Sequence, residues 1–133
     1  MMLPKISGII DRRILINYRI DLKVLEGLLP SKFKPISQNG YGVGGICLIR
    51  LKEIRPFFIP KFLGVSSENA AHRFAVSWEE AGKIHEGVYI PRRDTSLFLN
   101  SIMGGRIFPG VHHHSKFLVD EKDKNYQISF QAE

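Results

Sequence analysis

Three consecutive histidines, His112, His113 and His114, are the residues of this chain best suited to acid–base or metal chemistry. Imidazole titrates near neutral pH and is a common metal ligand. The surrounding stretch, RIFPGVHHHSKF (106–117), passes from a Pro-Gly turn into a predicted strand. Because side chains alternate along a strand, His112 and His114 share one face and His113 points to the other. A single site can therefore use at most two of the three.

A metal site is one interpretation of these histidines. His112 and His114 could chelate an ion from one strand face, with His72 or His85 completing the set. Their spacing matches no zinc signature, and the sequence contains no Cys-His cluster. We therefore expect no metal and no other cofactor, and keep the pair His112 and His114 as the alternative.

The elements that must position these residues are mostly strands. Alternating apolar residues predict strands over 9–20, 41–51, 68–78, 83–90, 111–119 and 126–131. Asp21 is expected to cap a short helix that Pro30 ends, and Asn39-Gly40 indicates a hairpin. Asp94 or Thr95 is expected to cap a second short helix, SLFLNSIM (96–103), which Gly104-Gly105 ends. These elements predict a strand-rich α+β fold with two short helices.

Composition limits the possible classes of protein. The chain has 133 residues, which predicts a single domain over 1–133, and a net charge of +6 whose basic residues are scattered. This charge could attract nucleic acid or an anionic metabolite, but the scattered basic residues and the absence of a nucleic-acid-binding motif argue against a nucleic-acid partner. No apolar run is long enough to span a bilayer, and Cys47 is the only cysteine, so we expect a soluble, cytoplasmic protein with no membrane partner.

The stretch GGICLIRL…SSENAAHRFAV…EGVYIPRRDTS…GGRIFPGVHHH resembles the uncharacterised bacterial proteins grouped as DUF2071, the YqjF-like proteins. That group is similar to the acetoacetate decarboxylase superfamily. The resemblance implies a cone-shaped, largely antiparallel β-barrel around a pocket. It also implies further C-terminal strands, which we do not find in this chain. The barrel is then expected to be incomplete: either the sequence is truncated, or another chain, such as a second copy in a homo-oligomer, covers the open edge.

The same resemblance implies a set of site residues. Glu68 matches the invariant glutamate of the decarboxylases, and Asp94 with Gly104-Gly105-Arg106 matches their acidic segment and Ala-Gly-Arg motif. Their two adjacent lysines, the first of which forms a Schiff base with the substrate, correspond here to His113-His114. Imidazole cannot form a Schiff base, so decarboxylase activity is not expected to carry over.

The functional prediction follows from that departure. His113 is expected to point into the pocket near Glu68 and to exchange a proton with the substrate. Arg106 or Arg93 is expected to bind a substrate carboxylate, with Asn69 beside it. The predicted partner is a small anionic metabolite, a keto or enol carboxylate. Under the alternative of a noncatalytic structural or interaction protein, Glu68 and an arginine form a buried structural pair and His113 is a polar plug.

Overall fold

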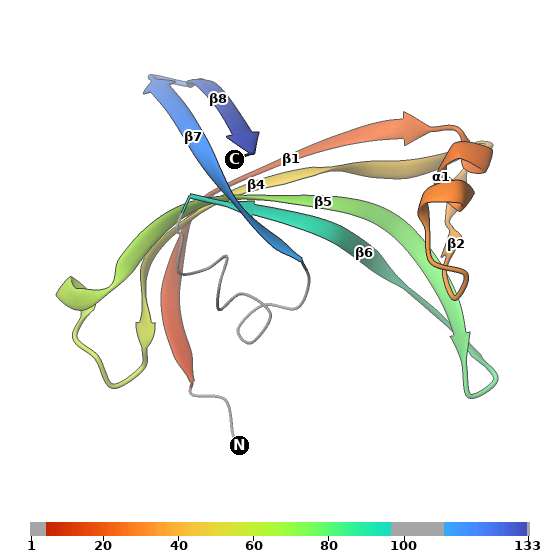
Figure 1. Cartoon of the computed structure of the whole chain (residues 1–133), viewed down its shortest axis with the longest axis horizontal. Helices are drawn as coiled ribbons and strands as arrows, with labels where there is room; N and C mark the ends of the chain where they lie inside the picture. The colour runs from red at the N-terminus through yellow and green to blue at the C-terminus, as the bar shows by residue number, and fades with distance from the viewer. Residues whose placement is uncertain (1–4, 97–110, 133) are drawn as a thin grey trace.

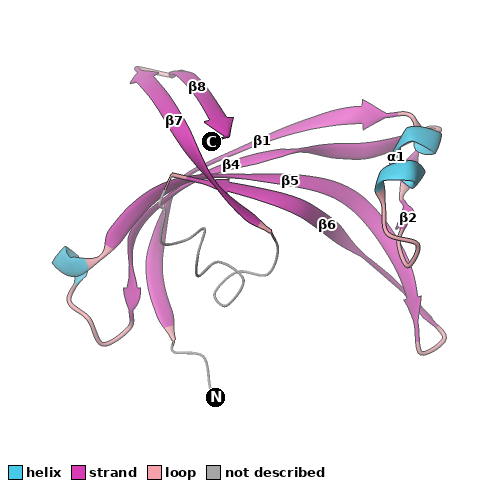
Figure 2. Ribbon diagram, in the orientation of Figure 1, coloured by secondary structure: helices cyan, strands magenta, loops and turns pink. Residues whose placement is uncertain are grey.

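The computed structural model describes residues 5–96 and 111–132, and most of them lie in one curled sheet (Figures 1 and 2). Neighbouring strands follow the order β1-β4-β5-β6-β7-β8. The strands are β1 (Ile6–Ile20), β4 (Tyr41–Pro56), β5 (Val65–Glu80), β6 (Lys83–Thr95), β7 (His112–Lys122) and β8 (Asn125–Ala132). Two short strands, β2 (Lys34–Pro35) and β3 (Ser37–Gln38), pair with β5 and β4. The strand-rich prediction is confirmed, and the sheet is a half-barrel rather than a closed barrel.

The four long strands β1, β4, β5 and β6 form an arch, as Figure 1 shows. Each pairs with the next in antiparallel register. The last residues of β6 pair with β7 in parallel. Arg93, Asp94 and Thr95 lie opposite His112, His113 and His114. From there β7 and β8 form a hairpin over the convex side of the arch (Figure 1). The sheet therefore has a concave face and a convex face, and the convex face carries the hairpin.

The single α-helix of the described residues, α1 (Leu22–Leu28), begins where the sequence predicts. The Asp21 carboxylate accepts hydrogen bonds from the backbone N–H groups of Lys23 (2.9 Å) and Val24 (3.2 Å), which are donors left without a partner at a helix start. Leu25 is fully buried, and a methyl group added at Gly42 would lie 2.5 Å from its Cδ2 atom. A residue without a side chain at position 42 thus lets α1 pack on β4.

Turn chemistry also matches the sequence prediction. Asn39 and Gly40 both adopt positive φ angles, 52° and 83°, between β3 and β4. Ala81 and Gly82 do the same between β5 and β6, at 52° and 74°. A two-residue hairpin turn with both φ values positive matches the twist of the strands that it joins.

The predicted second helix lies almost wholly outside the described residues, which include its two candidate caps. Asp94 and Thr95 are the last residues of β6 and are fully buried. They pair with β5 on one side and with β7 on the other. The Asp94 carboxylate is bonded to Arg92, Ser115 and His72.

The buried hydrophobic core is small. It consists of Leu25, Cys47, Leu48, Ala70, Ala71 and Val76. Within the described residues, few apolar side chains of the curled sheet are enclosed on both sides. No helix in the described part of the chain is long and apolar enough to cross a membrane.

Candidate functional site

A cavity of about 320 Å³ lies against the middle of the sheet, on the face opposite the hairpin. Its described lining comes from five strands and is mostly aliphatic. It consists of Gly8, Ile9, Ile10, Cys47, Ile49, Leu51, Ile54, Asn69, Ala70, Ala71, Arg93 and His112. The strand register explains why the polar lining residues Arg93, Asn69 and His112 lie close together. Arg93 is opposite Ala71 on β5 and opposite His112 on β7, and Asn69 lies two residues before Ala71. All of them therefore share one face.

Arg93 is the cation of this cavity. Its side chain is half-buried, and burial lowers the pKa of the guanidinium because the charged form loses hydration; the nearby Cys47 acts in the opposite direction. An arginine still remains protonated at neutral pH. A guanidinium in apolar surroundings offers strong, charge-assisted hydrogen bonds in a planar fork, the geometry that a carboxylate matches with its two oxygens.

Asn69 and His112 supply the other polar groups of the described lining. The side-chain nitrogen of Asn69 donates to Ser67 Oγ (2.9 Å) and to the carbonyl oxygens of Ser67 (3.2 Å) and Ile49 (3.4 Å). These bonds fix the amide and occupy its donor groups. The chemistry that Asn69 offers a ligand is therefore that of its carbonyl oxygen, an acceptor for a hydroxyl.

The convex face contains a different arrangement, in which acids and bases are paired. Glu68 accepts hydrogen bonds from Arg12 Nη2 and Arg50 Nε, both at 2.5 Å. The same two arginines bind Glu121 at the end of β7, with 3.0 Å between Arg50 Nη1 and Glu121 Oε2. Asp11 adds ion pairs with Arg50 (3.5 Å) and Lys52 (3.0 Å). This group connects β1, β4, β5 and β7, and we call it the glutamate–arginine network.

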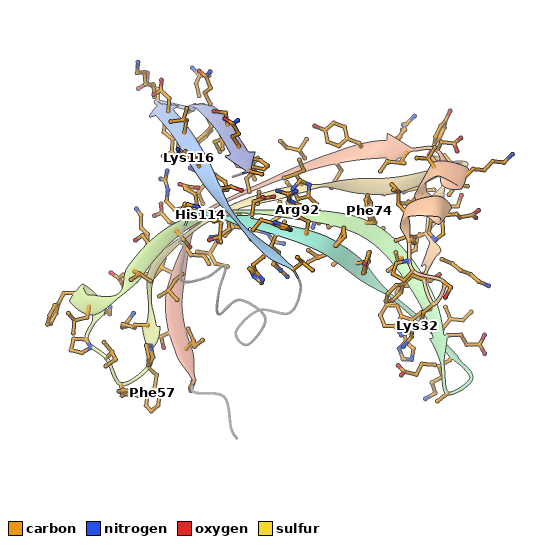
Figure 3. The ribbon with its side chains drawn as sticks, in the orientation of Figure 1. Lys32, Phe57, Phe74, Arg92, His114 and Lys116 are labelled. Atoms are coloured by element: carbon orange, nitrogen blue, oxygen red, sulfur yellow. The ribbon has the colours of Figure 1, made fainter. Side chains whose placement is uncertain are left out.

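A second buried group surrounds Asp94, whose side chain has no exposed surface. Its carboxylate accepts hydrogen bonds from Arg92 Nη2 (2.7 Å) and Ser115 Oγ (2.8 Å), and lies 2.9 Å from His72 Nε2. Burial raises the Asp94 pKa, but the hydrogen bonds from Arg92, Ser115 and His72 outweigh it, so the pKa lies below its ordinary value. Arg92, labelled in Figure 3, lies near the point where β7 crosses the sheet. We call these four residues the Asp94 cluster.

The Asp94 cluster is not an acyl-transfer triad. A nucleophilic serine needs a hydrogen bond to a histidine that takes its proton. Here the Ser115 hydroxyl donates to Asp94 instead. The cluster holds β5, β6 and β7 together, which is a structural role.

The structure separates the residues that the sequence analysis grouped into one site. Arg93 and Asn69 line the cavity, as expected of substrate-binding residues. Glu68 belongs to the glutamate–arginine network on the other face, which is the structural pairing that the alternative interpretation described. Arg106 lies outside the described residues.

The structure places His112, not the predicted His113, at the cavity. His112 lines the cavity, whereas His113 is exposed and lies opposite Asp94 in the parallel register. Ser115, two residues after His113 and on the same strand face, is hydrogen-bonded to Asp94, which places His113 on the convex side as well. The prediction relied on the position of a lysine in the decarboxylases, and the parallel pairing with β6 decides the face instead.

The metal alternative gains no support from the part of the chain that the structure describes. No three His, Cys, Asp or Glu side chains within residues 5–96 and 111–132 are arranged to hold an ion. His114 is half-buried next to the exposed His113, and Figure 3 shows it where β7 leaves the sheet.

Several site residues were missed from the sequence. Cys47, Ile49 and Leu51 alternate along a strand that the sequence did predict, and this alternation could have placed them on one face with a cavity. Nothing local marks the pairing of Arg12 with Glu121, which are separated by 109 positions.

Comparison of the chain with models of protein families, with curated proteins and with solved structures found no match. The assignment of a function therefore depends on the cavity and its residues.

Proposed function

We propose that the concave cavity binds a small organic anion, a keto or enol carboxylate with a short aliphatic body. The observation that carries the proposal is Arg93, a half-buried guanidinium in a mostly aliphatic lining. Burial lowers the pKa of this guanidinium, and its planar fork can give a carboxylate two parallel hydrogen bonds.

The rest of the lining fits the same class of ligand. Ile10, Ile49, Leu51 and Ile54 provide contact for an aliphatic body, and the Asn69 oxygen would accept a hydrogen bond from an enol or hydroxyl group. A volume of about 320 Å³ is at the small end of ligand pockets. We accordingly propose a metabolite of a few carbon atoms rather than a cofactor or nucleotide.

We propose that the chain shares the barrel type of the acetoacetate-decarboxylase-like proteins but not their covalent chemistry. The curled, mostly antiparallel sheet with a cavity on its inner face supports an incomplete barrel of that type. No lysine is among the described residues that line the cavity, and a Schiff base requires a primary amine. Any proton transfer in the cavity would fall to His112 rather than to His113. A single buried cysteine supports a cytoplasmic location.

The direct test is thermal unfolding of the protein with a panel of short keto, hydroxy and simple carboxylates. A ligand at a hundredfold excess over its Kd adds about 2.7 kcal/mol to the free energy of unfolding, which is readily seen as a higher Tm. Arg93→Met is expected to abolish the shift, and Arg93→Lys to leave a weaker one because the planar fork is lost.

Arg73→Met is the matched control. It removes the same charge from the strand next to β6, but the Arg73 guanidinium binds Asn17 (3.0 Å) and Arg73 is not among the described lining residues. The control should keep most of the ligand-induced shift. A panel without any response, or a response that Arg93→Met leaves intact, contradicts the proposal. Salt-sensitive binding of nucleic acid in its place would favour the noncatalytic interaction protein.

A second experiment tests the chemistry rather than the binding. Borohydride added with acetoacetate should leave the mass of the protein unchanged, because neither His112 nor Arg93 forms a reducible imine. An adduct mapped by mass spectrometry to a lysine would restore the decarboxylase interpretation.

A further inference from the structure

Strand β1 is an edge strand of the sheet, and in the described part of the chain no strand pairs with its outer side. Its apolar residues are unusually accessible. Ile9, Ile10, Leu15, Ile16 and Tyr18 are 47%, 61%, 46%, 39% and 56% exposed. An open edge with accessible apolar side chains is a template for pairing with another strand.

The accessible area supports a missing partner of substantial size. The chain exposes 9585 Å², whereas a monomer of 15.2 kDa is expected to expose about 7,100 Å². The excess is comparable with the area that an obligate homodimer buries.

Two other edges of the described sheet are less suited to pairing. The stretch 83–92 of β6 contains Lys83, Glu86 and Pro91, and charges or proline at an edge discourage strand addition. On β8 polar residues alternate with apolar ones, as in NYQISFQ (125–131). The centre of β1, Ile14-Leu15-Ile16, has neither charge nor proline. The charged residues of β1, Asp11, Arg12, Arg13 and Arg19, flank this apolar centre, which makes the centre the part of the edge suited to pairing.

We propose that a second copy of this chain pairs with β1, strand to antiparallel strand, about a two-fold axis at Leu15. This register places each Ile14 opposite the other copy's Ile16 and Leu15 opposite itself. Arg13 then lies opposite Asn17, which can accept its hydrogen bonds. Apolar pairs meet in the centre and no like charges face each other. The two half-barrels would share one continuous sheet.

Neighbouring registers are worse, and this favours a second copy over a partner of unrelated sequence. With the axis at Ile16, Arg13 would face the other copy's Arg19, and like charges across a strand pair are destabilising. With the axis at Ile14, Leu15 would face Arg13. The strand is self-complementary in the register centred on Leu15, as an isologous interface requires.

The test measures oligomeric state by size-exclusion chromatography with light scattering. The wild-type chain should have twice its mass of 15.2 kDa. Leu15→Glu should weaken the dimer about a hundredfold, because two leucines leave the interface and two carboxylates meet at the axis. Leu118→Glu, on the 73% exposed Leu118 of β7, is the control and should remain a dimer.

Cross-linking tests the register independently of any loss of folding. In a Cys47→Ala background, Leu15→Cys should form a disulfide-linked dimer on mild oxidation, since directly opposed residues of antiparallel strands lie close enough. Leu118→Cys should not. A wild-type monomer at high micromolar concentration, or a dimer that Leu15→Cys fails to cross-link, overturns the proposal.

Discussion

Two arginines on opposite faces of the arch have pKa values shifted in opposite directions. On the convex face Glu68, Glu121 and Asp94 each accept hydrogen bonds from arginines, and the pKa of Arg50 is raised above its ordinary value, chiefly by its hydrogen bond to Glu68. On the concave face the pKa of Arg93 is lowered, chiefly by burial. The same residue type therefore serves as a structural tie on one face and as a candidate ligand anchor on the other.

The comparison shows what a half-barrel with a small core uses in place of apolar burial. The hairpin β7–β8 meets the sheet through the Asp94 cluster, the glutamate–arginine network and a ring contact of His72 with Phe130, 6.2 Å between centroids. These contacts occupy the convex face. On the concave face, the aliphatic side chains of the described residues line the cavity instead.

The largest expected effect on stability is that of Asp94→Asn. The substitution removes the buried carboxylate that Arg92, Ser115 and His72 bind. Because the Arg92 side chain is 38% exposed and stays solvated, the loss should be about 1–3 kcal/mol of unfolding free energy. Urea unfolding measures the loss. Hydrogen exchange should show faster exchange in β7 and β8 than in β4. Asp120→Asn, at an exposed pair of 3.9 Å with Lys122, is the control and should change stability by about 0.5 kcal/mol at most. Equal losses for the two variants would contradict the role assigned to the cluster.

The next effect is loss of stability in acid. Asp94, Glu121 and Asp11 all have pKa values below their ordinary ones because of their bonds to Arg, Lys, Ser and His side chains. The unfolded chain therefore binds protons at a higher pH than the folded chain does. The stability from these groups is complete above their ordinary pKa values, 3.8 and 4.5, and is lost as the pH falls through the lower folded-state values.

Urea midpoints between pH 7 and pH 2 check this dependence. We expect a plateau down to about pH 5 and a decline below about pH 4. In Asp94→Asn the decline should be shallower, because one of the shifted carboxylates is gone. A decline that begins near pH 6 would instead point to the histidines.

The smallest effect is expected on the concave face. Arg93→Met replaces a half-buried cation by an apolar chain of similar length. Relief of the desolvation offsets the polar interaction that is lost, so the free energy of unfolding should change by about 1 kcal/mol or less. The urea midpoint without ligand measures it. A loss as large as that of Asp94→Asn would mean that Arg93 is a structural tie like the arginines of the convex face.

Local signals predicted much of the fold. The cap at Asp21, the turn at Asn39-Gly40 and the alternation in β1 all depend on residues close in sequence, and each is confirmed. Pairing between distant strands could not be predicted in this way. Asp94 carries a local helix-start signal, yet it is paired as a strand residue with β5 and with β7.

The candidate site was only partly predictable for the same reason. Alternation correctly limited the histidines to two faces, but which face meets the cavity depends on the parallel pairing of β7 with β6. Glu68 was noticed as a functional residue, yet its partners Arg12 and Arg50 come from two other strands. The spacing of these residues in the sequence does not predict that they form ion pairs.

The sequence separation between contacting residues affects the order in which the contacts form during folding. The β5–β6 hairpin turns within two residues at Ala81-Gly82 and the β7–β8 hairpin within two at Asp123-Lys124, so both can close within microseconds. The contact of Arg12 with Glu121 spans 109 positions and needs both ends of the chain in place. Because the loop-closure entropy of such distant contacts is large, we expect the glutamate–arginine network to be completed last during folding.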